Sequence, residues 1–356
     1  MTRMFGVLIG AAAALLVARG TDAGTIVYVS VSGENRIDVY EADGGRLRRT
    51  SNAATDGAPG ALAYCPKRQL LFAALRPEGR LVVFQVAPET GALTFISTHD
   101  VEIDPAHLCV DEAGNFLLAA YYPSGQISVH RIGEDGRLAE PGAFTPTAVN
   151  AHAVVLHPRD ESRLYVPHTS ANRIFQFAFD RDSGNVRPLN RPYRTTPDGT
   201  GPRHLVFHER LNVAYVSNEQ GGSVSVWNYD PSSGDLSLRQ TVSTLPGGFQ
   251  GQNACSEIRL RPGSRHLYVA NRGHDSLAAF SINPEDGRLT AIRQAVTEQT
   301  PRSFDIDPDG TRVYAAGEGS GHIKIYRIDD TTGELLPGDR VYVGMAPWWV
   351  MAIAAP

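Results

Sequence analysis

The sequence predicts an all-β protein, a seven-bladed β-propeller folded as one domain, and three observations lead to this fold class. A unit of four short apolar segments recurs along the 356-residue chain at intervals of 46 to 53 residues, which is typical of a propeller blade. The 35 glycines and 23 prolines favour a turn-rich fold, and no segment sustains a helical apolar period. The two chain ends carry complementary parts of one unit.

The repeat is clearest when the segment from Arg203, RHLVFHERLNVAYVSNEQGGSVSVW, is set beside that from Arg302, RSFDIDPDGTRVYAAGEGSGHIKIY. Both contain a short apolar strand, a turn, a second apolar strand, a Gly/Ser loop and a third, alternating strand. An acidic turn containing glycine and a weaker fourth strand complete each unit. The equivalent first-strand positions are Gly60, Ala106, His152, Arg203, Ser256, Arg302 and Trp348.

The chain ends predict how the ring closes. The segment from Thr25, TIVYVSVSGENRIDVY, begins with the second strand of a unit, whereas the C-terminal APWWVMAIAAP is a first strand without the rest. Together they make the seventh blade and leave no unpaired sheet edge at the junction. We therefore predict a single domain over residues 24–356, in which the C-terminal strand completes the N-terminal blade.

Residues 1–23 have the character of a cleaved signal peptide. Arg3 supplies a positive start, residues 5–17 form an apolar run too short to span a bilayer, and small residues lead to Ala23. An N-terminal helix or a membrane anchor is the alternative interpretation. We predict that the mature protein is periplasmic or secreted and has no membrane contact after cleavage.

Composition excludes several other functions. With a net charge of -5 and no basic stripe interleaved with aromatic residues, the chain is not expected to bind nucleic acid. The three cysteines, Cys65, Cys109 and Cys255, lie in apolar runs and form no metal-binding pattern, so we expect small buried side chains. Acidic loops such as DPSSGD fit hairpin turns better than calcium sites. No cofactor or metal is predicted.

Blade topology brings charged residues to one end of the central channel. In an antiparallel blade, the face where the first strand starts is also the face where the second strand ends. Because the first strands ring the channel, their starting residues should gather at its mouth. The residues expected there are His152, Arg203, His204, Glu219, Arg272, His274 and Arg302.

This group suits a small anionic molecule. Guanidinium groups bind carboxylate or phosphate with paired hydrogen bonds, and a carboxylate or neutral imidazole can act as a general base. A structural interpretation stays open, because Arg203 and Arg302 are repeat-equivalent and could cap loop carbonyls. Glu219 and Arg272 could simply pair with each other. Trp348 and Trp349 are expected to pack the closing strand.

The motifs around these residues resemble those of a known family. GPRHLVFH followed by YVSNE, then RHLYVANRGHDSLAAFSI, TPRSFDIDPDG and a terminal APWWV, are similar to the seven-bladed propeller lactonase family. Its members include a bacterial 6-phosphogluconolactonase and a fungal 3-carboxy-cis,cis-muconate lactonizing enzyme. The resemblance extends from about Thr25 to the C-terminus.

The resemblance implies a metal-independent site that hydrolyses an acidic, sugar-derived lactone. The catalytic pattern of the family falls on His152, Arg203, Glu219 and Arg272, with Arg302 as a further candidate. Glu219 or His152 would activate water, while the arginines hold the anionic group and stabilise the oxyanion. Position at the mouth adds three substrate-binding candidates, namely Arg302, His204 and His274.

Two other functions remain compatible with the sequence. A non-catalytic extracytoplasmic binding propeller of the YVTN type would scatter its charged residues around the ring. A lactonizing cycloisomerase would share the site and differ only in the reaction. The enzymatic hypotheses require Arg203, Arg272 and Glu219 to converge. We expect a monomer with a small anionic lactone as its substrate.

Overall fold

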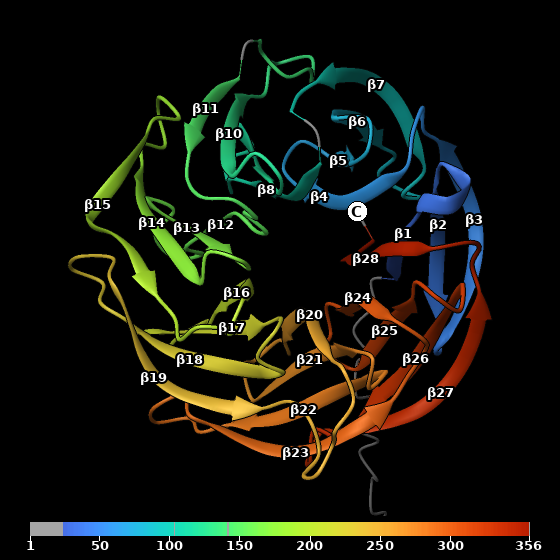
Figure 1. Cartoon of the computed structure of the whole chain (residues 1–356). Helices are drawn as coiled ribbons and strands as arrows, with labels where there is room; N and C mark the ends of the chain where they lie inside the picture. Colours follow the sequence, from blue (N-terminus) through green and yellow to red (C-terminus); the bar gives the residue numbers. More distant parts are fainter. Residues whose placement is uncertain (1–23, 103, 141, 356) are drawn as a thin grey trace, which may run out of the picture.

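The computed structural model describes residues 24–102, 104–140 and 142–355 and shows seven four-stranded antiparallel sheets arranged in a ring (Figure 1). The prediction of an all-β, seven-bladed propeller is confirmed. The only helical element within the described ranges is a short 3-10 turn, η1 (Ser32–Glu34). The predicted signal peptide, residues 1–23, lies outside the described residues.

Each blade contributes one strand to each of four concentric positions. The innermost strands are β28 (Pro347–Ala354), β4 (Pro59–Cys65), β8 (Pro105–Val110), β12 (Val155–Leu156), β16 (Pro202–Phe207), β20 (Ala254–Leu260) and β24 (Pro301–Ile306). The second strands are β1 (Thr25–Val31), β5 (Leu70–Leu75), β9 (Phe116–Tyr121), β13 (Arg163–His168), β17 (Val213–Asn218), β21 (His266–Arg272) and β25 (Arg312–Gly317). The third strands are β2 (Arg36–Asp43), β6 (Arg80–Val86), β10 (Gln126–Arg131), β14 (Arg173–Phe179), β18 (Ser223–Tyr229), β22 (Ser276–Ile282) and β26 (His322–Ile328). The outermost strands are β3 (Arg46–Ala54), β7 (Leu93–Asp100), β11 (Ala143–Pro146), β15 (Val186–Thr195), β19 (Leu236–Ser243), β23 (Leu289–Val296) and β27 (Leu335–Tyr342).

The ring closes through the composite blade β28-β1-β2-β3. The C-terminal strand β28 pairs with β1 along its length, from Thr25↔Ala354 to Ser30↔Trp349. Numbered from this composite blade, the remaining six follow chain order, so β4 to β7 form blade 2 and β24 to β27 form blade 7. No helix in the described part of the chain is both long enough and apolar enough to cross a membrane.

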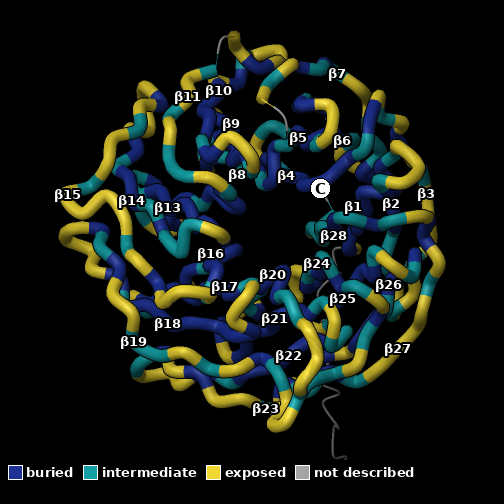
Figure 2. The backbone as a smooth tube through the Cα atoms, in the orientation of Figure 1, coloured by how far each residue is buried: buried dark blue, intermediate teal, exposed yellow. Residues whose placement is uncertain are grey.

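Burial falls from the inner strands to the rim. Every residue of β5, β9 and β17 is buried, whereas the outermost strands β15 and β27 are mostly exposed (Figure 2). Neighbouring blades cover both faces of each second strand, which explains the continuous apolar sequences of these strands. Cys65 and Cys255 are buried and Cys109 is half-buried, and all three are free thiols.

A tyrosine hydroxyl links several blades to the next. Tyr28 Oη donates to the Gly91 carbonyl at 2.8 Å, and Tyr215 Oη donates to the Gly287 carbonyl at 2.9 Å. Gly91 has a φ of +69°, and a Cβ there would lie 2.9 Å from Ile26. The glycine of the acidic turn is therefore required both for its left-handed backbone and for the close approach.

A one-residue bulge near the start of the innermost strands turns the repeat position toward the channel. In blade 5, Pro202 pairs with Asn218 and His204 with Ser217, so Arg203 has no partner in β17. The same shift leaves Arg302 unpaired in β24 and Trp348 unpaired in β28. Bulges redirect side chains at sheet edges, and here they bring chemically different residues to equivalent places around the mouth.

Candidate active site

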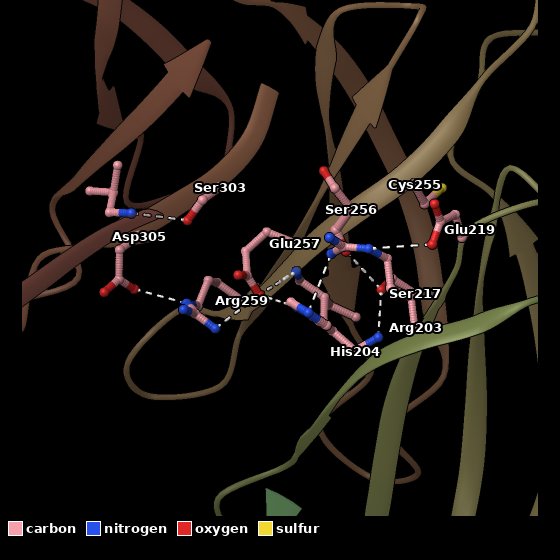
Figure 3. A network of polar contacts seen from close by, with 12 residues as sticks. Arg203, His204, Ser217, Glu219, Cys255, Ser256, Glu257, Arg259, Ser303 and Asp305 are labelled. Atoms are coloured by element: carbon pink, nitrogen blue, oxygen red, sulfur yellow. Dashed lines mark hydrogen bonds and ion pairs between the residues drawn. The ribbon is translucent and has the colours of Figure 1, made fainter. Parts of the chain in front are cut away.

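Glu219 joins two arginines at the channel mouth. Arg272 Nη2 donates to Glu219 Oε1 at 2.7 Å, and Arg203 Nε lies 3.4 Å from Oε2. Glu219 directly follows β17, and its backbone N–H donates to the Gly201 carbonyl at 2.6 Å, which fixes the carboxylate next to the start of β16. The predicted convergence of these three side chains is therefore observed, and the contact between Arg203 and Glu219 is drawn in Figure 3.

Burial and neighbouring charges have opposing effects on the pKa of Glu219, and together they lower the pKa of Arg203. Burial alone would raise the pKa of Glu219, but Arg203 and Arg272 outweigh it and lower that pKa, so the carboxylate is ionised. Burial, reinforced by Arg272, lowers the pKa of Arg203 to about 10. Arg203 therefore keeps its positive charge at neutral pH while only 2% of its surface is exposed.

Arg302 reaches the mouth from blade 7 and lies against an indole ring. Its guanidinium carbon is 3.6 Å from the centroid of Trp348, and a looser ion pair of 3.7 Å joins it to Glu318. Arg76 approaches the same ring at 5.3 Å. Trp348 was expected only to pack the closing strand, and this expectation is wrong, because the bulge turns the indole toward the arginines.

His152 lies beside the arginines as a neutral ring. It is 4% exposed, and its centroid is 5.5 Å from Tyr122 and 5.1 Å from His204. Burial and the nearby Arg203 hold the pKa of His152 well below its usual range. Its buried Nδ1 has no hydrogen-bond partner among the described residues.

The two other predicted histidines lie differently. His204 is 3% exposed and sits beneath the mouth, where it contacts Glu257 and Arg203. The Nδ1 of His274 lies 2.7 Å from Ser276 Oγ, and its ring packs on Phe249 at 4.9 Å. These contacts hold His274 to the start of β22 and to the connection between β19 and β20, and no contact with Arg203 or Arg302 is seen among the described residues.

Comparison with known proteins identifies the family. Residues 26–352 match the family described as lactonase, 7-bladed beta-propeller. The chain belongs to this lactonase family. It is 33% identical over 330 residues to the 6-phosphogluconolactonase of Enterobacter sp. (strain 638), covering 92% of this chain and 98% of that protein. It is 32% identical over 331 residues to the 6-phosphogluconolactonase of Klebsiella pneumoniae (strain 342), with the same coverage.

A solved structure has the same fold as this lactonase. The periplasmic gluconolactonase PpgL of Pseudomonas aeruginosa superposes with a TM-score of 0.85 at 26% identity. The match covers 94% of this chain and 99% of PpgL. The family expected from the sequence motifs is thereby confirmed.

In this lactonase a pocket of about 390 Å³ lies on the side of blades 1 to 3, next to Trp348, the ring that Arg302 covers. Arg76 and Trp348 form part of its wall, and the Arg76 Nε donates to Asp104 across it. A Cβ at Gly60 would come within 3.0 Å of Arg76, so the glycine leaves space for this arginine. The pocket is lined by Ser32, Ala58, Gly60, Arg76, Pro77, Asp104, Pro123 and Trp348.

Arg76, Tyr122 and Glu318 are not among the residues that the sequence predicts at the mouth, although the repeat carries their signal. Each follows the last residue of a second strand, as Glu219 follows β17. The structure thus shows that this position after the second strand contributes to the mouth in more blades than Glu219 and Arg272 alone indicate. Among the described residues, no group of three or more His, Cys, Asp or Glu side chains could hold a metal ion.

Proposed function

We propose that this lactonase hydrolyses a sugar-derived acidic lactone at the channel mouth without a metal ion. The observation that supports this proposal most strongly is the ion-paired group of Arg203, Glu219 and Arg272 next to the neutral His152. The names of the two bacterial relatives, both 6-phosphogluconolactonases, point to the same substrate class.

In the proposed reaction, His152 acts as the general base. It takes a proton from water as the oxygen attacks the lactone carbonyl, and Arg203 and Arg272 stabilise the resulting oxyanion. Collapse of the tetrahedral intermediate breaks the ring C–O bond, and the proton returns from His152 to the departing alkoxide. The product is the open hydroxy acid. We prefer His152 to Glu219 as the base because both Glu219 oxygens face arginines.

The net charge of the ionised side chains at the mouth suits a substrate with a single negative charge. Four arginines, Arg76, Arg203, Arg272 and Arg302, face three carboxylates, Asp104, Glu219 and Glu318. One positive charge is left to interact with the substrate anion or the developing oxyanion. A phosphate dianion would have to compete with the carboxylates that already pair with these arginines.

We also infer that residues 1–23 direct export and are removed. Support comes from the charged start and apolar run of this segment and from the similarity to PpgL, which is named a periplasmic gluconolactonase. Intact-mass analysis of the protein from a periplasmic fraction would give a chain starting near Gly24. A full-length mass in the cytoplasmic fraction would contradict the inference.

The function is tested by hydrolysis assays with the purified mature protein. Proton release is compared for 6-phosphoglucono-δ-lactone, glucono-δ-lactone and a muconolactone, each with and without a chelator, and with Arg203→Ala as a control. We expect chelator-insensitive turnover of at least one lactone that is lost in the variant. Ring opening of muconolactone to muconate instead of hydrolysis would indicate a cycloisomerase. No turnover above the spontaneous rate would favour a binding propeller.

A further inference from the structure

A chain of buried and partly buried polar contacts links the innermost strands of three neighbouring blades (Figure 3). Arg203 Nη1 lies 3.3 Å from His204 Nε2, and His204 Nδ1 lies 2.9 Å from Glu257 Oε1. Arg259 Nη1 donates to the same Glu257 oxygen at 3.0 Å, and its Nε donates to Asp305 Oδ1 at 3.0 Å. These side chains come from β16, β20 and β24, the innermost strands of blades 5, 6 and 7.

The chain is anchored to the strand that closes the ring. Asp305 Oδ2 accepts a hydrogen bond from the Ala352 N–H of β28 at 2.9 Å. Glu257 is completely buried, and its Oε1 also accepts from the backbone N–H of Ile258 at 3.0 Å. A carboxylate held by three donors at one oxygen has little freedom to turn.

The contacts determine which nitrogen of His204 carries the proton. An arginine can only donate a hydrogen bond, so Nε2 must accept the bond from Arg203. An ionised carboxylate can only accept, so Nδ1 must donate to Glu257. Burial lowers the pKa of His204 to about 4, despite the opposing effect of Glu257, so the ring is neutral at pH 7. Both contacts require the Nδ1–H tautomer.

We propose that Glu257 and His204 are positioning residues: Glu257 holds His204 in the Nδ1–H tautomer, and the free Nε2 lone pair then orients the guanidinium of Arg203. With Nη1 engaged by His204 and Nε facing Glu219, the remaining N–H groups of Arg203 have a fixed direction. Orientation of a charged donor before the reaction is a main source of transition-state stabilisation. The catalytic part of this inference rests on the proposed lactone hydrolysis, whereas the tautomer does not.

The tautomer can be observed directly. In histidine-labelled protein at neutral pH, ¹⁵N NMR separates protonated from unprotonated ring nitrogens, and the spectrum of His204→Gln assigns the His204 signals. We expect the proton on Nδ1. A proton on Nε2 would overturn the proposal, because Nε2 would then present a donor to the donor of Arg203. This result is independent of whether any lactone is hydrolysed.

Two amide substitutions test the effect on catalysis. The carbonyl oxygen of His204→Gln can take the place of Nε2 and accept from Arg203, whereas His204→Asn mimics only the Nδ1 side. We expect His204→Asn to lower kcat by about 10- to 100-fold, since a small misplacement of a catalytic group has this effect. His204→Gln should recover most of that loss, and KM should change less than kcat. Equal kcat values for the two variants would contradict the proposal.

Glu257→Gln provides a second measurement if His204→Asn does not fold. It keeps the shape but removes the charge that fixes the tautomer, and we expect kcat to fall by about 10-fold or more. Glu161→Gln is the matched control, because Glu161 is also buried but lies in the β12–β13 turn, on the opposite face of the ring. It should leave kcat unchanged. An unchanged kcat in Glu257→Gln would overturn the positioning role.

Discussion

His152 connects the electrostatics of single residues to the pH range of activity. Its pKa is lowered first by burial and then by the charges of Arg203, Arg76 and Arg302, together with the neighbouring His204. A general base works only when unprotonated, so activity is lost as pH falls through the pKa of the base. A histidine of ordinary pKa would lose half its activity near pH 6.5, at about its reference value.

We therefore expect kcat/KM to stay level from neutral pH to well below pH 6.5, with its acid limb displaced to lower pH. Arg302→Gln removes one of the charges that disfavour the imidazolium, so its acid limb should move to higher pH. The pH profile of lactone hydrolysis, corrected for the spontaneous rate, measures both. An acid limb at or above pH 6.5 in the unsubstituted protein would rule out His152 as the base.

The contact between Arg302 and Trp348 gives a second prediction at this scale. A cation over an indole face contributes about 0.5 to 2 kcal/mol, so Trp348→Leu should lower kcat/KM by about 2- to 30-fold. Trp348→Phe keeps an aromatic face and should lose less. Steady-state kinetics on the preferred lactone provide the comparison. Equal losses in the two variants would mean that the indole acts only by filling space.

At the scale of strands, the bulge in the innermost strands contributes both to the fold and to the site. The bulge near the start of β16, β24 and β28 lets the chain enter the blade while turning one side chain to the channel. Repeat-equivalent positions can then diverge without changing the blade. Sequence spacing predicted this equivalence, but it could not predict that His204, one residue past the bulge, is directed beneath the mouth to Glu257.

The tyrosine-to-glycine bonds between blades lead to a prediction about stability. Tyr215→Phe removes the donor to the buried Gly287 carbonyl and should destabilise the fold by about 1 to 3 kcal/mol. The free energy of unfolding from urea titration measures the change. Tyr342→Phe, at a tyrosine that is 62% exposed, is the control and should have little effect. Equal stabilities of the two variants would show that the bond between blades contributes nothing.

For the whole molecule, the sequence was informative because propeller blades repeat. The spacing of the first strands and the complementary chain ends predicted seven blades and their closure, which the structure confirms. Topology predicted that Arg203, Arg272 and Glu219 converge, but it also placed His274 with them and left out Arg76. The role of Trp348 did not follow from topology, because an aromatic residue at the start of a strand looks the same whether it packs a core or supports an arginine.

Closure by β28 should be essential to the whole ring. A chain ending at Gly344 would lose the innermost strand of blade 1 and expose the edge of β1. We expect this truncated protein to lack a cooperative unfolding transition and to aggregate, as measured by thermal unfolding and size-exclusion chromatography. A soluble, cooperatively folded product would contradict the account of closure.

The central claim is that the arginine group at the mouth performs lactone hydrolysis. The most direct test is kcat for Arg203→Lys beside Arg261→Lys on the lactone that turns over fastest. Arg261 is similarly buried and ion-paired, but lies on the opposite face of the ring, in the β20–β21 turn. A lysine cannot reproduce the planar fork of donors, so Arg203→Lys should lower kcat by about 100- to 1,000-fold. Arg261→Lys should retain full activity, whereas equal activity of the two variants would contradict the claim.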